Sequence, residues 1–147
     1  MDERTLRLLQ LAQKGYTCSQ IIVLMGLEAR GETNPGLIRA MAGLAYGCGS
    51  GRASCGALTG GCCLLALYAG KGSDQEEGSE KLMAMLQDLS DWFGERIGGS
   101  SSGLACETIT GEEGPAASQQ RCGALVTDTF TKVMEILAAY EFDLTGG

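Results

Sequence analysis

The chain has 147 residues, 44% of them hydrophobic and 20% charged, with a formal net charge of -7 and no histidine. This length predicts one domain covering residues 1–147. The negative charge argues against a nucleic-acid-binding surface, because phosphate contacts need clustered lysine and arginine side chains. The lack of histidine excludes Ser-His-Asp and Cys-His catalytic pairs, and metal or haem sites that use histidine ligands.

The apolar stretches of the sequence are too short for membrane spans. The longest candidates, such as GCCLLALYAG, have the length of one buried helix. The N-terminal segment MDERTLRLLQLAQKG is charged and amphipathic, unlike a signal peptide. We therefore expect a protein of the reducing cytoplasm without membrane insertion, in which the seven cysteines are metal ligands or redox thiols rather than a disulfide framework.

Apolar residues recur every three or four positions, which predicts helices rather than strands. A first helix over about residues 3–14 begins at an Asp2 cap. Its inward side chains are expected to be Leu6, Leu9 and Leu11. Two further helices are predicted over about residues 17–28 and 35–46, the latter after an Asn-Pro start signal.

Three more helices are predicted in the second half of the chain. Ser54 is expected to cap a helix from Cys55 to Ala69, after the glycine-rich joint GCGSGRA. Another helix spans about residues 79–97, and the last follows a cap at Ser118. The segments GGSSSG and LACETITG between them are interpreted as a flexible joint and a short turn or helix. The predicted fold class is all-α, a compact bundle of about five or six short helices.

Cysteines at or near predicted helix starts form the main candidate site. Cys18 and Cys55 lie in the first turns of their helices, Cys122 lies about one turn into the last helix, and Cys106 follows the flexible joint. The unsatisfied N–H groups and partial positive charge of a helix start lower the pKa of a thiol and stabilise an anionic cluster. We therefore predict that these four cysteines share one metal or redox site.

Small residues follow Cys55 in the stretch CGALTGG, and the letters CGAL return at Cys122. A glycine inside a helix costs about 1 kcal/mol relative to alanine, so these glycines are expected to serve packing or binding. We predict that Gly56, Ala57 and Gly60 allow a second backbone or a bound group to approach closely.

Three other cysteines are less clearly placed. Cys48 and Cys62 are candidate additional members of the site. Cys62 follows Cys55 by seven residues and therefore lies on the same helix face. Cys63 points about 100° away and is expected to lie in the core. For any one cysteine, simple burial as a small apolar residue is an equal alternative.

The cysteine arrangement resembles the C-GCAxxG-C-C family of redox-active proteins over most of the chain. Cys18 in YTCSQ looks like the first cysteine of that family, and Cys55 in CGALTG looks like the cysteine of its central motif. Cys106 and Cys122 look like the last two cysteines, and WFGERIG ahead of CETITG is also similar. The resemblance implies a small helical protein whose thiols pair or hold a metal centre that moves electrons. The additional cysteines Cys48, Cys62 and Cys63 depart from the pattern and leave open which thiols are ligands.

The spacing of the four cysteines favours a site enclosed by the fold. They are separated by 37, 51 and 16 residues and no CxxC occurs, so the short chelate loops of ferredoxins and zinc ribbons are absent. We predict a [2Fe-2S] or [4Fe-4S] cluster in an accessory electron-transfer protein, with a redox protein as its partner and a homodimer as one open arrangement. The alternatives are a metal-free thiol–disulfide protein and a structural or sequestering zinc-binding module with four cysteine ligands.

Overall fold

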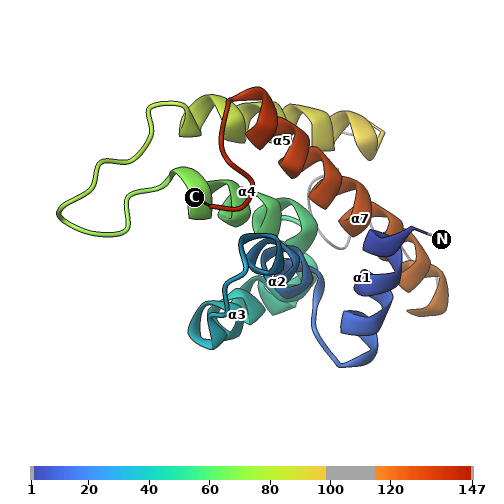
Figure 1. Cartoon of the computed structure of the whole chain (residues 1–147). Coiled ribbons are helices and arrows are strands. Elements are labelled where there is room, and N and C mark those ends of the chain that lie inside the picture. The colour runs from blue at the N-terminus through green and yellow to red at the C-terminus, as the bar shows by residue number, and fades with distance from the viewer. Residues whose placement is uncertain (1, 99–114, 147) are drawn as a thin grey trace.

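The computed structural model of the protein describes residues 2–98 and 115–146 (Figure 1). Within these ranges the chain forms six α-helices and no strand, which confirms the predicted all-α class. The flexible joint and the short turn predicted from residue 99 to residue 111 lie outside the described residues, and Cys106 lies there too.

The helices follow the predicted order with adjusted ends. Asp2 accepts a hydrogen bond from the Thr5 N–H, and Asn34 accepts one from the Leu37 N–H, so both predicted caps are confirmed. The α-helices are α1 Glu3–Gln13, α2 Cys18–Arg30, α3 Pro35–Met41, α4 Gly56–Ala69, α5 Leu82–Arg96 and α7 Pro115–Ala139.

The third helix is shorter than predicted, and an irregular segment replaces its end. It continues as the 3-10 turn η1 Ala42–Leu44 and then reaches the turn η2 Gly47–Gly51. The helical backbone ends at Ala45, which is extended with ψ of 139°. A run of left-handed backbone follows, with φ of 52° at Tyr46, 61° at Gly47, 57° at Cys48 and 82° at Gly49. A right-handed helix cannot pass through such residues.

Two predicted helix starts are wrong. The cap of α4 is Cys55 and not Ser54, because Cys55 has non-helical backbone with ψ of 136° and helical geometry begins at Gly56. The last helix starts at Pro115, where proline needs no N–H partner, so Ser118 lies inside the helix.

The inward face of α1 also differs from the prediction. Leu8 and Leu11 are buried at 4% and 1% exposure, whereas Leu6 and Leu9 are exposed at 50% and 40%. Adjacent positions on a helix point about 100° apart, so a face centred on Leu8 and Leu11 turns Leu6 and Leu9 toward solvent.

Helix α4 lies at the centre of the bundle and contacts α2, α5 and α7 (Figure 1). A Cβ atom on Gly61 would stand 3.0 Å from Leu89 of α5 and 3.3 Å from Val133 of α7, so both helices pack closely against this glycine. The largest fully buried side chains include Phe93, Leu64, Leu65, Met85, Leu89, Leu137 and Ile22. No helix in the described part of the chain has the length and apolar character needed to span a membrane.

Candidate functional site

The first turns of α2 and α4 lie side by side. A side chain on Gly56 would meet Cys18, and a side chain on Gly26 would meet Leu64. The start of α2 therefore contacts the start of α4, and later residues of α2 contact later residues of α4. The two helices run in the same direction, and their positive dipole ends face the same region.

Gly56 is the point of closest approach at this junction. A Cβ atom there would lie 2.6 Å from Cys18 Sγ, 3.4 Å from the Ser19 amide nitrogen and 3.4 Å from the Leu44 carbonyl oxygen. Three segments of the chain thus meet around one glycine. Any larger residue would take up the space that the Cys18 sulfur occupies.

Gly60 makes the corresponding contact one turn further along α4. A Cβ atom on Gly60 would lie 3.0 Å from both the Cα atom and the carbonyl oxygen of Ser19. Because these are backbone atoms, the helix itself would have to shift to accept a side chain. The glycine spacing in α4 therefore fixes how near the first turn of α2 can come.

The second cysteine of the junction is Cys55. It occupies the cap position of α4, directly before Gly56, and its side chain is buried at 4% exposure. Cys18 is the first residue of α2 and is partly buried. The fold therefore brings two of the four predicted site cysteines to one junction of helix starts. Ala57, in the first turn of α4, is buried at 1% exposure.

Polar side chains next to Cys18 fix the first turn of α2. The fully buried Ser19 hydroxyl donates a 2.8 Å hydrogen bond to the Met41 carbonyl oxygen. The Gln20 side chain accepts a 3.0 Å hydrogen bond from the Thr17 N–H and donates a 3.1 Å bond to the Ile38 carbonyl oxygen. Ser19 is not among the site residues predicted from the sequence. Its signal is a polar residue in helical register with Ile22 and Gly26, on the face that packs against α4.

Cys62 and Cys63 lie on α4 and are both partly buried. Burial, together with the neighbouring Cys63, raises the pKa of the Cys62 thiol from 9.0 to about 11. Burial also raises the pKa of Cys63. Both thiols stay protonated near neutral pH, which makes them poor nucleophiles and poor metal ligands in this state.

Cys48 is exposed and lies in the left-handed turn before α4. The Gly47 carbonyl oxygen closes this turn by accepting hydrogen bonds from the Ser50 hydroxyl at 3.3 Å and the Ala53 N–H at 3.4 Å. Left-handed backbone is costly for a residue with a Cβ atom, so both Tyr46 and Cys48 hold strained conformations.

The structure describes the remaining predicted site residues only in part. Cys106 lies outside the described residues, and Cys122 is described only as a backbone position in α7. With α7 starting at Pro115, Cys122 lies about two turns into the helix, which corrects its predicted place near the helix start. Within residues 2–98 and 123–146, no three cysteine, aspartate or glutamate side chains group closely enough to hold a metal ion. The fourfold thiol site stays a prediction.

Comparison with known protein families identifies the family of this chain. The model of a family described as "Putative redox-active protein (C_GCAxxG_C_C)" matches residues 16–136, a range that contains every cysteine of the chain. No curated protein and no solved structure matches the chain.

Proposed function

The chain belongs to the C_GCAxxG_C_C family of redox-active proteins, and from this premise we propose that Cys18, Cys55, Cys106 and Cys122 bind an iron–sulfur cluster used in electron transfer. The partner is another redox protein that donates or accepts the electron.

The observation that carries the proposal is the contact of Cys18 Sγ with the Gly56 position, one residue from the buried Cys55. Two cysteines 37 residues apart in the sequence thus lie at the starts of two parallel helices that contact each other. Placing two positive helix ends together is unfavourable unless negative charge lies between them. Thiolate ligands and the anionic cluster that they hold supply that charge.

The donor set fits an iron–sulfur centre in its chemistry. Such clusters are held by cysteine thiolates, and the two described cysteines of the junction offer sulfur ligands beside exposed backbone N–H groups of a helix start. When bound, the cluster supplies a one-electron redox centre. Cys18 and Cys55 would hold the cluster, the burial of Cys55 would exclude water from it, and the positive helix starts would offset its negative charge. Cys106 and Cys122 are assigned here as the other two ligands.

A second candidate function is metal-free thiol–disulfide exchange, which needs only Cys18 and Cys55. The Cys18 sulfur contacts the Gly56 position, and Cys55 is the residue directly before that glycine. Oxidation of the two thiols to a disulfide releases two electrons to an acceptor and two protons to solvent. This function needs neither Cys106 nor Cys122.

The experiment is anaerobic purification followed by iron, sulfide and zinc analysis and an absorption spectrum. An iron–sulfur centre gives a brown protein with visible absorption, which C18S, C55S, C106S and C122S each abolish, while the matched control C63S keeps it. A metal-free protein in which an oxidant removes two titratable thiols, and C18S or C55S prevents this, supports the second function. A colourless protein with stoichiometric zinc contradicts both and indicates the zinc module with four cysteine ligands.

A further inference from the structure

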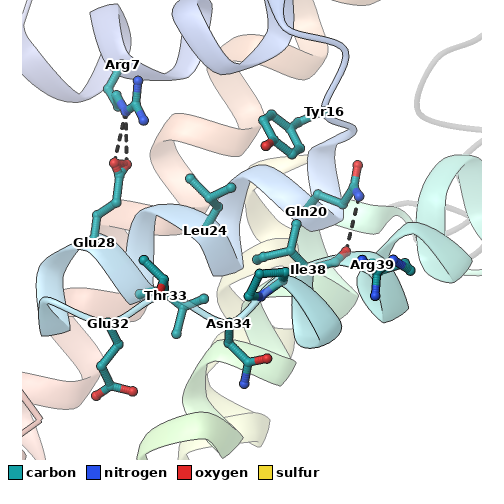
Figure 2. Close-up of a pocket in the computed structure, with 12 residues that line it drawn as sticks. Arg7, Tyr16, Gln20, Leu24, Glu28, Glu32, Thr33, Asn34, Ile38 and Arg39 are labelled. Carbon is teal, nitrogen blue, oxygen red and sulfur yellow. Dashed lines mark hydrogen bonds and ion pairs between the residues drawn. The ribbon is translucent and has the colours of Figure 1, made fainter.

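A cavity of about 550 Å³ lies between α1, α3 and one face of α2 (Figure 2). This volume falls within the roughly 300–1,000 Å³ of small-molecule sites. Gln20 and Leu24 of α2 line the cavity, whereas Cys18 and Ser19 of the same helix contact α4. The cavity and the thiol junction therefore occupy different faces of α2.

The floor of the cavity is apolar. Leu24 stands between the Arg7–Glu28 pair and Ile38, and its side chain is only partly buried (Figure 2). Leu27, Pro35 and Ile38 complete the apolar lining. A partly exposed leucine at the centre of a concavity gains free energy when an apolar group covers it.

The carboxylates of the cavity wall are both neutralised. Arg7 Nε donates to the two carboxylate oxygens of Glu28 at 2.9 Å and 3.0 Å. Arg30 Nε, from outside the lining, pairs with Glu32 Oε2 at 2.8 Å. These ion pairs weaken the repulsion that two free carboxylates would exert on an approaching anion.

Arg39 is the remaining charged residue of the cavity wall. Among residues 2–98 and 123–146, its guanidinium has no ion-pair or hydrogen-bond partner. The lining holds two guanidiniums, Arg7 and Arg39, and two carboxylates, and Arg30 beside it adds a third guanidinium to this region. In a chain with a net charge of -7, this local excess of positive charge is the feature that would select an anion.

We propose that this cavity is a binding site for a small organic carboxylate with an apolar body, whose carboxylate pairs with Arg39 while the body covers Leu24. A guanidinium suits a carboxylate because its planar donors match the two carboxylate oxygens. The proposal does not involve the cysteines and stands or falls apart from the redox function.

The probe is phenylacetate, compared with the isosteric neutral phenylacetamide, and binding is followed by methyl NMR signals of Leu24 and Ile38 on the full chain. We expect saturable shifts of both signals and about fivefold tighter binding of phenylacetate, the size of one solvent-exposed ion pair. R39Q should remove this preference. The control K71Q, which removes the same charge from the exposed loop after α4, should keep it.

Three results overturn the proposal. The first is the absence of saturable shifts at millimolar phenylacetate. The second is equal binding of acid and amide to the unmodified protein, which would indicate a purely apolar pocket. The third is a preference that R39Q and K71Q change equally, which would assign the effect to overall charge.

Discussion

The Cα atom and the carbonyl oxygen of Ser19 both lie 3.0 Å from the point where a Cβ atom on Gly60 would stand. The neighbour at Gly56 is instead a side-chain atom, Cys18 Sγ. This difference separates the expected effects of two similar substitutions, because a thiol can rotate away while a helix backbone must move as a unit.

Gly60→Ala is expected to destabilise the protein by about 1–3 kcal/mol, because α2 must shift away from α4. The measurement is chemical denaturation followed by circular dichroism. The matched control is Gly94→Ala in α5, where a Cβ atom meets nothing within 4 Å. That control should stabilise the protein by about 0.5–1 kcal/mol through helix propensity. Equal effects of the two substitutions would contradict the close contact with Ser19.

Gly56→Ala is expected to act on the thiol site more than on stability. The added methyl group takes the place of Cys18 Sγ, so the sulfur must adopt another rotamer. We expect a changed absorption spectrum or redox potential with a smaller loss of stability than Gly60→Ala gives. An unchanged spectrum and potential, measured on anaerobically purified protein, would show that the Cys18 sulfur is not part of the centre.

Ser19→Ala is expected to cost about 1–2 kcal/mol, since it leaves the buried carbonyl oxygen of Met41 without its 2.8 Å hydrogen bond. The comparison is Thr129→Val, which keeps the shape of a fully buried side chain. The Thr129 hydroxyl donates to the Leu125 carbonyl oxygen within its own helix. That bond lies within one helix and joins no two segments of the fold, so a smaller loss is expected. Denaturation midpoints of the two variants check the order, and a larger loss for Thr129→Val would contradict it.

The Cys62 thiol is expected to resist alkylation at neutral pH, because its pKa is raised to about 11. Mass spectrometry after iodoacetamide treatment should find the exposed Cys48 modified well before Cys62. A thiol with a raised pKa favours the folded state while it is protonated. Its contribution is therefore complete below pH 9.0, the ordinary pKa, and is lost as the pH rises toward 11. Fast modification of Cys62 at neutral pH in folded protein would contradict this assignment.

Cys48→Gly is expected to stabilise the protein by about 1 kcal/mol, because φ at this position is 57° and glycine adopts this conformation without strain. Cys48→Ala, the control, keeps a Cβ atom and should give no gain. Thermal unfolding of both variants checks the difference. If Cys48→Gly also loses the visible absorption of the anaerobic protein, Cys48 belongs to the metal centre and the four-cysteine assignment is wrong.

Several features of the fold could be predicted because they depend on local chemistry. Asp2 and Asn34 cap their helices through their own side chains, and the apolar period over Met85, Leu89 and Phe93 marks a buried face. The left-handed run at Tyr46 to Gly49 could be read only as a glycine-rich joint, because two of its members are not glycine.

The sequence by itself determined that the chain is helical, that it belongs with redox-active proteins, and that Cys18 and Cys55 stand at helix starts. The helical period, the caps and the positions of these thiols depend on residues close together in the sequence. They can therefore be predicted without knowledge of the fold. The tertiary structure alone decided that the starts of α2 and α4 lie together, that Cys18 rests against Gly56, and that Leu8 rather than Leu9 faces the core. These depend on contacts between residues far apart in the chain, and packing selects among faces that local spacing leaves equivalent.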